Sequence, residues 1–138
     1  MSFPAADGWL PLDDGTFVAD LGAVHQRETE GECELGLVVG GHLRNRSGLL
    51  HGGVLMTLID RAGGIPAGRV AGDARIATAS LTVNFLRPVP ADARLIVRGR
   101  LRRAGRKTFF TDCEAFVDAL LVATATAIYM LVGERMAQ

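Results

Sequence analysis

Hydrophobic and polar residues alternate with a period of two through most of the second half of the chain. Leu81 and Val83 stand between polar neighbours, and Leu95 and Val97 alternate with Arg94, Arg98 and Arg100. This period is typical of strands that place one face on a core. Breaks that contain proline, glycine or aspartate separate four runs, which we predict to be strands: residues 77–88, 93–104, 107–117 and 120–132.

A helical period occurs in the middle of the chain. From Val54 to Ile65, apolar residues recur at spacings of three and four, which predicts one amphipathic helix over about residues 51–69. Pro66 and the two glycines shortly before it weaken the second half of this helix, where we expect a kink.

Two extended runs precede the helix. Residues 23–30 and 31–39 predict two strands joined by a turn at Gly31, and alternate residues from Cys33 to Val39 fall on one face. The order of elements is therefore two strands, one long helix and four strands. Short connections between sequential strands favour an antiparallel sheet, so we predict an α+β domain with one helix against about six strands.

The beginning of the chain has no such periodicity. Prolines and glycines among acidic residues predict an irregular arm over residues 1–16, with Phe3 and Trp9 as possible anchors. Residues 17–22 predict a short helical turn. We expect a single domain over residues 17–138.

Length and composition fit that single domain. The chain has 138 residues, 49% of them hydrophobic, and its formal net charge is zero, so no field of one sign favours nucleic acid or an anionic membrane. Cys33 and Cys113 form no CxxC pair, and we expect two reduced thiols in the core rather than a metal site. Because no signal-like segment and no apolar run of about 18 residues occurs, we expect a soluble cytoplasmic protein without a membrane span.

The predicted helix begins with the residues HGG and carries one acid, Asp60, two turns further along. The first N–H groups of a helix lack acceptors and lie at its positive end, and a glycine at position 52 lets a carbonyl oxygen approach them without a Cβ in the way. Such donors suit an oxyanion site, beside which Asp60 could act as nucleophile or general base. The simpler alternative is a solvated carboxylate on the polar side of the helix.

These two groups cannot easily serve the same carbonyl within one chain. Gly52 and Asp60 lie roughly 12 Å apart along the axis of one helix. A two-fold dimer could place the acid of one subunit beside the glycine of the other.

The same residues belong to a longer pattern, which resembles that of the hotdog-fold acyl-CoA thioesterases, in particular their PaaI-like, phenylacetate-pathway branch. The pattern consists of Asn45, His51-Gly52-Gly53, Asp60 nine positions after the histidine, TASLTVNFLRP and GRKTFF. The resemblance covers about residues 17–132. It implies a curved antiparallel sheet wrapped around one long helix, and homodimers that pair into homotetramers with active sites at the dimer interface.

The resemblance also implies roles for four residues of this chain. The Gly52 N–H would polarise the thioester carbonyl, with Asn45 helping to place it. Asp60 of the partner subunit would be the nucleophile or general base, and Thr78 would orient the water or the acid.

Two further residues at the start of the helix are expected to line the substrate site. They are His51 and Gly53. The His51 side chain falls on the helix face opposite Asp60, so we expect it to brace the loop rather than to transfer protons.

Positive charges gather in residues 98–107. Arg98, Arg100 and Arg102 share one strand face, which we interpret as a solvated edge that blocks further strand pairing. The alternative is recognition of the CoA phosphates, for which arginine forks are well suited. The residues that we expect to contact these phosphates are Arg87, Arg103, Arg106 and Lys107.

The sequence therefore predicts hydrolysis of an acyl-CoA thioester to a free acid and CoA, without a metal ion or another cofactor. One alternative is a hotdog hydratase or dehydratase of enoyl or hydroxyacyl thioesters, which requires a histidine placed with an acid. A second alternative is a non-catalytic acyl-CoA binding module. The sequence does not specify which acyl group the substrate carries.

Overall fold

The structure is a computed structural model, and it describes residues 2–13, 15–72 and 74–133. The strands of this part are β1 (Leu10–Pro11), β2 (His25–Thr29), β3 (Glu32–Val38), β4 (Ile76–Phe85), β5 (Arg94–Ala104), β6 (Thr108–Val117) and β7 (Leu120–Leu131). The long helix is α1 (Gly52–Ala71), and short 3-10 turns are η1 (Ala5–Asp7), η2 (Phe17–Leu21) and η3 (Gly41–Leu43).

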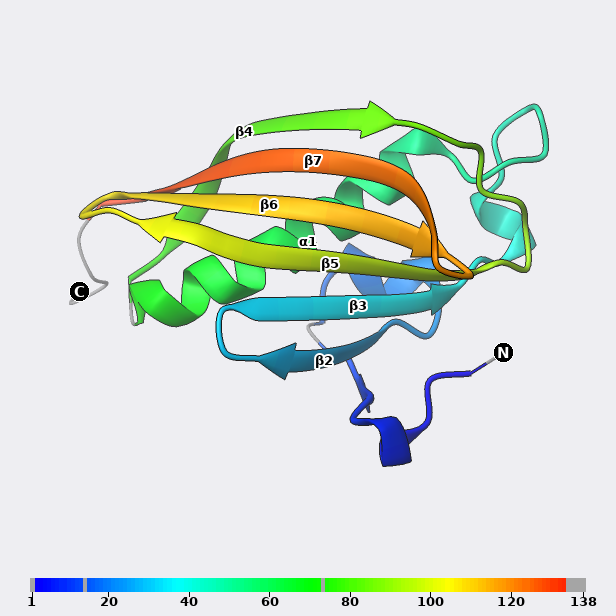
Figure 1. Cartoon of the computed structure of the whole chain (residues 1–138), viewed down its shortest axis with the longest axis horizontal. Coiled ribbons are helices and arrows are strands. Elements are labelled where there is room, and N and C mark those ends of the chain that lie inside the picture. Colours follow the sequence, from blue (N-terminus) through cyan, green and yellow to red (C-terminus); the bar gives the residue numbers. More distant parts are fainter. Residues whose placement is uncertain (1, 14, 73, 134–138) are drawn as a thin grey trace.

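The described strands form one antiparallel sheet in the order β1-β2-β3-β5-β6-β7-β4. In Figure 1 the sheet stands in front, and α1 runs behind it. The connection through α1 carries the chain from β3 to the far edge of the sheet, where β4 pairs with β7. The predicted α+β class and all six predicted strands are confirmed.

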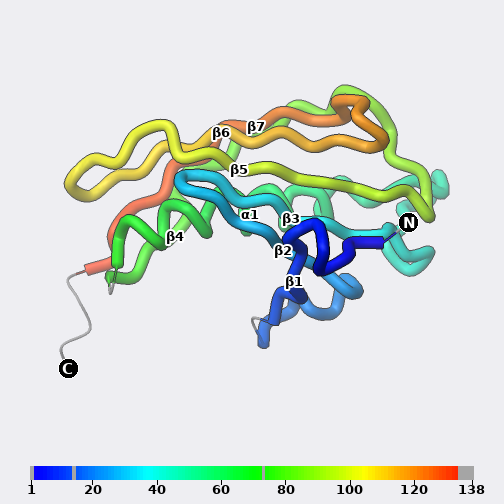
Figure 2. Tube along the Cα trace, turned by 60° about the horizontal axis from the view of Figure 1, so that its bottom comes forward, coloured from blue at the N-terminus to red at the C-terminus, as the bar shows by residue number. Residues whose placement is uncertain are grey.

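The N-terminal arm is more ordered than the sequence predicts. Its β1 adds a seventh strand next to β2, so the expectation of a wholly irregular segment is wrong. Phe3 and Trp9 are both buried, which confirms them as anchors, and the Phe3 ring occupies the space where a side chain at Gly36 would lie. Figure 2 shows this segment beside β2 and β3.

The domain boundaries stay predictions. Residue 16 marks no break in the structure, because the arm before it packs on the sheet. The last residues of the predicted domain, 134–138, lie outside the described residues. Within the described part of the chain, no helix combines the length and the apolar character that a bilayer crossing requires.

The helix continues two residues further than predicted, through Pro66 to Ala71. Ile65, Pro66 and Ala67 are buried, so contact with the sheet stabilises the half that propensity alone would weaken. Because proline has no N–H, the Ala62 carbonyl loses its usual helical donor.

Two glycines let the backbone of α1 lie directly on the sheet. A Cβ at Gly99 of β5 would overlap the Ala62 carbonyl group. A Cβ at Gly63 would come within 3.1 Å of three side-chain atoms, from Thr111, Cys113 and Tyr129. Both positions therefore require glycine for the observed distance between helix and sheet.

The core lies between α1 and the inner face of the sheet. As the alternation predicts, Leu35, Leu95 and Val97 are fully buried there. Cys33 and Cys113 are buried and free, which confirms the predicted thiols.

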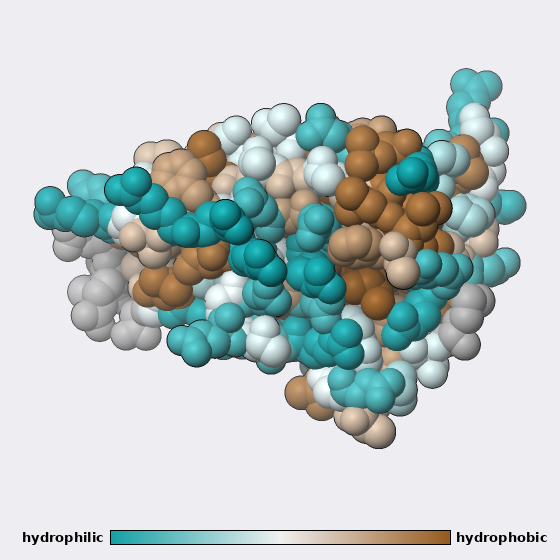
Figure 3. All heavy atoms as spheres, in the orientation of Figure 1, coloured by the Kyte–Doolittle hydropathy of each residue, from teal (hydrophilic) through white to brown (hydrophobic). Residues whose placement is uncertain are grey.

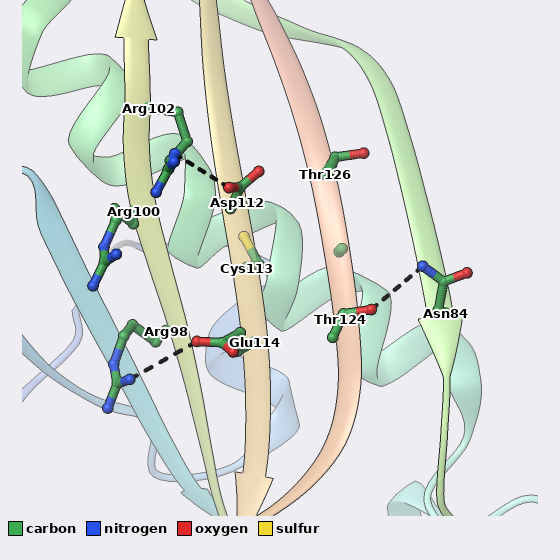
Figure 4. Close-up of a pocket in the computed structure, with 10 residues that line it drawn as sticks. Asn84, Arg98, Arg100, Arg102, Asp112, Cys113, Glu114, Thr124 and Thr126 are labelled. Carbon is green, nitrogen blue, oxygen red and sulfur yellow. Dashed lines mark hydrogen bonds and ion pairs between the residues drawn. The ribbon is translucent and has the colours of Figure 1, made fainter.

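The outer face of the sheet carries rows of paired charges. Arg98 lies 3.0 Å from Glu34 and 3.9 Å from Glu114, and further pairs include Arg27 with Glu34, Arg100 with Glu32 and Arg102 with Asp112. Figure 4 shows Arg98 and Arg102 of β5 joined to Glu114 and Asp112 of β6, and hydrophilic residues cross the middle of this face in Figure 3. Because β5 lies between β3 and β6, the interpretation of these arginines as a sheet edge is wrong.

Replacing Gly99 with alanine should strongly destabilise the protein. The added Cβ would meet backbone atoms of α1, which cannot rotate away. We expect the free energy of unfolding, measured by urea denaturation, to fall by about 3 kcal/mol.

The matched control is Gly68→Ala on the same helix. The nearest atom to its Cβ would be Ile76 Cδ1 at 4.0 Å, so this variant should be as stable as the parent or slightly more stable. Equal stability of Gly99→Ala and the parent would contradict the close contact between α1 and β5.

Candidate active site

Asp60 lies half-buried on the side of α1 that the core leaves uncovered. A cleft of about 800 Å³ opens beside it, between α1, η2 and β4. Apolar side chains form much of its wall, including Met56, Ile76 and Leu81. The predicted acid therefore faces a cavity with room for an organic group, and not open solvent alone.

Thr78 lies directly against this acid. Its Oγ1 donates a hydrogen bond of 2.7 Å to Asp60 Oδ1, which brings together two residues that the sequence predicts as catalytic. A β-bulge between Thr78 and Ser80 makes the contact possible. The extra residue reverses the alternation of β4, so Thr78 faces α1 although Ser80 faces the outer side of the sheet.

Tyr129 of β7 contacts the same turn of the helix from the side of the sheet. Its hydroxyl donates a hydrogen bond of 2.7 Å to the main-chain carbonyl of Asp60, and its ring is almost fully buried. Burial raises the pKa of Tyr129, and the negative charge of Asp60 raises it further, so the hydroxyl remains a donor at neutral pH. Sequence reasoning missed Tyr129, because the two residues lie 69 positions apart.

The first turn of α1 presents one unoccupied amide. His51 is the N-cap, and its Nδ1 accepts a hydrogen bond of 2.9 Å from the Gly53 N–H. Among the described residues, no acceptor contacts the Gly52 N–H. Of the two glycine amides, Gly52 is therefore the one that can receive a ligand oxygen, and His51 braces the turn as predicted.

Asn45 shapes the loop beside this amide. Its Oδ1 accepts hydrogen bonds from the N–H groups of Ser47, at 2.9 Å, and Leu49, at 3.1 Å. These two bonds fix the orientation of the amide, so Nδ2 is the atom left to donate to a ligand. A cleft of about 320 Å³ lies between Asn45, Gly52 and the exposed Phe85.

The two halves of the predicted site are separate within one chain. Gly52 and Asn45 line one cleft, whereas Asp60 and Thr78 line another. The eight residues between Gly52 and Asp60 span roughly 12 Å of helix. One chain therefore holds two complementary half-sites.

The four predicted phosphate contacts are also divided. Arg87 lines the cleft beside Gly52, where its guanidinium donates to the Leu121 carbonyl at 2.6 Å. Arg103 lies near the end of β5, and Arg106 and Lys107 lie in the turn that follows, at the opposite end of the sheet in Figure 1. One chain does not bring these three together with Gly52, and their contact with phosphates stays a prediction.

Comparison with known proteins places the chain in a family. A family model described as Thioesterase superfamily matches residues 47–123, more than half of the chain. The chain belongs to the thioesterase superfamily. The sequence pattern predicts the hotdog fold of this superfamily and, within it, the phenylacetate-pathway branch.

Individual relatives agree with this assignment. The acyl-coenzyme A thioesterase THEM4 of Bos taurus is 37% identical over 93 residues, which cover 66% of this chain and 37% of that protein. The chain thus spans less than half the length of the curated relatives it matches.

Solved structures show the same fold. A phenylacetic acid degradation-related protein from Ralstonia eutropha JMP134 is 32% identical and has a TM-score of 0.75, with 82% of this chain and 87% of that chain covered. The protein smu.793 of Streptococcus mutans UA159, bound to acetyl CoA, is 24% identical with a TM-score of 0.74, over 83% of this chain and 92% of that chain.

Alkaline pH should destabilise the protein through its two thiols. Burial raises the pKa of Cys33 and of Cys113 from 9.0 to about 12. The unfolded chain releases these protons at lower pH than the folded chain, so their stabilising contribution is complete below about pH 9 and is lost as the pH rises towards about 12.

Urea denaturation at a series of pH values measures this loss. A variant with both cysteines replaced by alanine should lose stability less steeply across that window than the parent. Equal slopes would contradict the assignment to the thiols.

Proposed function

We propose that the protein is an acyl-CoA thioesterase, which hydrolyses an acyl-CoA to a free acid and CoA. Asp60 of one subunit and the Gly52 N–H of a second subunit act on the same thioester carbonyl. The observation that carries this proposal is the Asp60–Thr78 hydrogen bond at the mouth of a cleft, on a helix whose first amide is unoccupied.

Two of the comparisons support the substrate. The bovine relative is named an acyl-coenzyme A thioesterase, and the Streptococcus mutans neighbour holds acetyl CoA. The apolar wall beside Asp60 favours an apolar acyl group in that cleft.

The exposed edge of the sheet supports a dimer. β4 has ten residues and pairs with β7 on one side. It contains neither a charged residue nor a proline, the features that usually protect a free edge from further pairing. We expect β4 to pair with β4 of a second copy, in antiparallel orientation about a two-fold axis.

Such a pair would combine the half-sites. With the axis near Leu81, at the middle of β4, Thr78 would stand opposite Asn84 of the second copy. Phe85 follows Asn84, and its ring lies within 3.4 Å of where a Cβ of Gly52 would be. The Asp60 end of one subunit would therefore meet the Gly52 end of the other.

The chemistry then uses both half-sites. With Asp60 as general base, the carboxylate takes a proton from water, and the oxygen of that water attacks the thioester carbon. The negative charge that develops on the carbonyl oxygen is stabilised by the Gly52 N–H, with Asn45 Nδ2 beside it. The carbon–sulfur bond then breaks, the free acid forms, and the CoA sulfur receives the proton.

Asp60 could instead attack the carbonyl carbon itself, with water hydrolysing the resulting anhydride. Single-turnover hydrolysis in water labelled with oxygen-18 separates the two routes. If water opens the anhydride at the Asp60 carboxyl carbon, the first acid carries an unlabelled oxygen from Asp60 and the label enters Asp60, whereas the general-base route gives a labelled acid and leaves Asp60 unlabelled.

The geometry of His51 weighs against a hydratase. Its Nδ1 accepts the Gly53 N–H, so this nitrogen is engaged in capping α1 and is not placed to exchange a proton with a substrate. A histidine that gains a proton at Nδ1 would lose its hydrogen bond from the Gly53 N–H, and with it the cap of α1.

The homotetramer predicted from the sequence stays a prediction. The outer face of the sheet, which could bind a second dimer, carries charges that are already paired within one chain.

Asp60→Asn should keep the fold and lose most turnover. The amide neither accepts a proton from water nor attacks the thioester, so we expect kcat to fall by roughly 10²- to 10⁴-fold. Thiol release from a panel of acyl-CoA substrates measures the loss.

Asp112→Asn is the matched control, because Asp112 lies on the outer face and pairs with Arg102. It should keep the parental rate. If kcat of Asp60→Asn stays within a few-fold of the parent, Asp60 is not the reacting group. If the parent binds acyl-CoA but releases no thiol with any substrate, the protein is a binding module.

A further inference from the structure

We propose that the loop from Arg44 to His51, here called the basic loop, binds the phosphate groups of CoA. The inference rests on the proposed function for the identity of the substrate. It assigns the phosphates to the end of the molecule that holds Gly52 and Arg87, and not to the turn between β5 and β6, around which the sequence predicts the other three phosphate contacts.

A cavity of about 600 Å³ lies on the basic loop. It is lined by Arg44, Asn45, Arg46, Ser47 and His51. Asn45 also lines the cleft beside Gly52, so the two cavities meet at this residue. A thioester held at Gly52 could therefore extend its pantetheine arm past Asn45 and place its phosphates on the basic loop.

Hydrogen bonds hold the basic loop in one conformation before any ligand binds. The Asn45 N–H donates to the Leu49 carbonyl at 2.6 Å, and the His51 N–H donates to the Leu43 carbonyl at 2.9 Å. The Asn45 side chain accepts two further N–H groups from inside the loop. Phosphate binding would thus require little additional ordering of the loop.

The donors on the basic loop remain available. Arg44 uses its Nε to donate to the Gly41 carbonyl at 2.8 Å, which orients the guanidinium and leaves its terminal nitrogens for a ligand. Among the described residues, Arg46 has no carboxylate partner. His51, whose Nδ1 caps α1, can donate from Nε2.

The charge around the loop favours anions. The sequence contains no acidic residue between Glu34 and Asp60. Of the described residues that line the basic-loop cavity and the Gly52 cleft, none is acidic, and Arg87 adds a third guanidinium. By contrast, Arg98, Arg100 and Arg102 on the outer face already lie against carboxylates. Arginine forks without a protein carboxylate are the ones suited to phosphate.

Calorimetric binding of CoA and of pantetheine tests the proposal. The double variant Arg44→Gln/Arg46→Gln should bind CoA at least roughly tenfold more weakly than the parent, because it loses two charge-assisted contacts. Pantetheine has no phosphate, so its affinity should change by a much smaller factor. The CoA affinity of the parent should fall as the salt concentration rises, and that of the double variant should fall less steeply.

Two further variants complete the comparison. Arg102→Gln, on the outer face, controls for the loss of a positive charge and should bind CoA as the parent does. Arg106→Gln tests the rival turn. Parental CoA affinity in the double variant, an equal loss for CoA and pantetheine, or a loss confined to Arg106→Gln would each overturn the proposal.

This experiment requires no turnover. If the protein binds CoA through the basic loop but releases no thiol, the proposed hydrolysis is refuted and the binding site is supported. A parent that hydrolyses acyl-CoA while the double variant keeps full CoA affinity would refute the site and leave the hydrolysis standing.

Discussion

The position of Asp60 depends on how closely α1 approaches the sheet. Gly99 and Gly63 leave no Cβ between the two layers, so the helix backbone lies on β5, β6 and β7. At that distance Tyr129 reaches the Asp60 carbonyl, while the carboxylate on the other side of the same turn receives Thr78. Side chains at the two glycines would push the helix outward and separate the acid from both partners.

The rigidity of the helix then explains why one chain presents two half-sites. Its first turn offers the Gly52 amide, and its third offers Asp60, at a separation that cannot change while α1 stays intact. The uncharged β4 edge provides a second copy with a surface to pair with, and a two-fold axis near its middle exchanges the two ends of the helix. Assembly and chemistry therefore depend on the same element.

The sequence predicts much of this arrangement. Local periodicity is enough to locate six strands and the helix, and the HGG motif with Asp60 indicates the two half-sites. Local periodicity does not predict features that depend on strand register. The bulge that turns Thr78 inward and the contact from Tyr129 arise from pairings across the sheet. For the same reason the sequence predicts Arg98 at a solvated sheet edge, whereas in the structure it lies inside the sheet and pairs with Glu34 of β3.

Activity of mixed dimers tests the composite site most directly. Asp60→Asn removes one half-site. Gly52→Pro removes the donor of the other, at a first helical position where proline is well tolerated. Each variant alone should be inactive. When the two are unfolded and refolded together in equal amounts, random pairing should restore about a quarter of the parental thiol release, since half of the dimers would contain one intact site. No recovery in dimers shown to contain both chains would contradict the account.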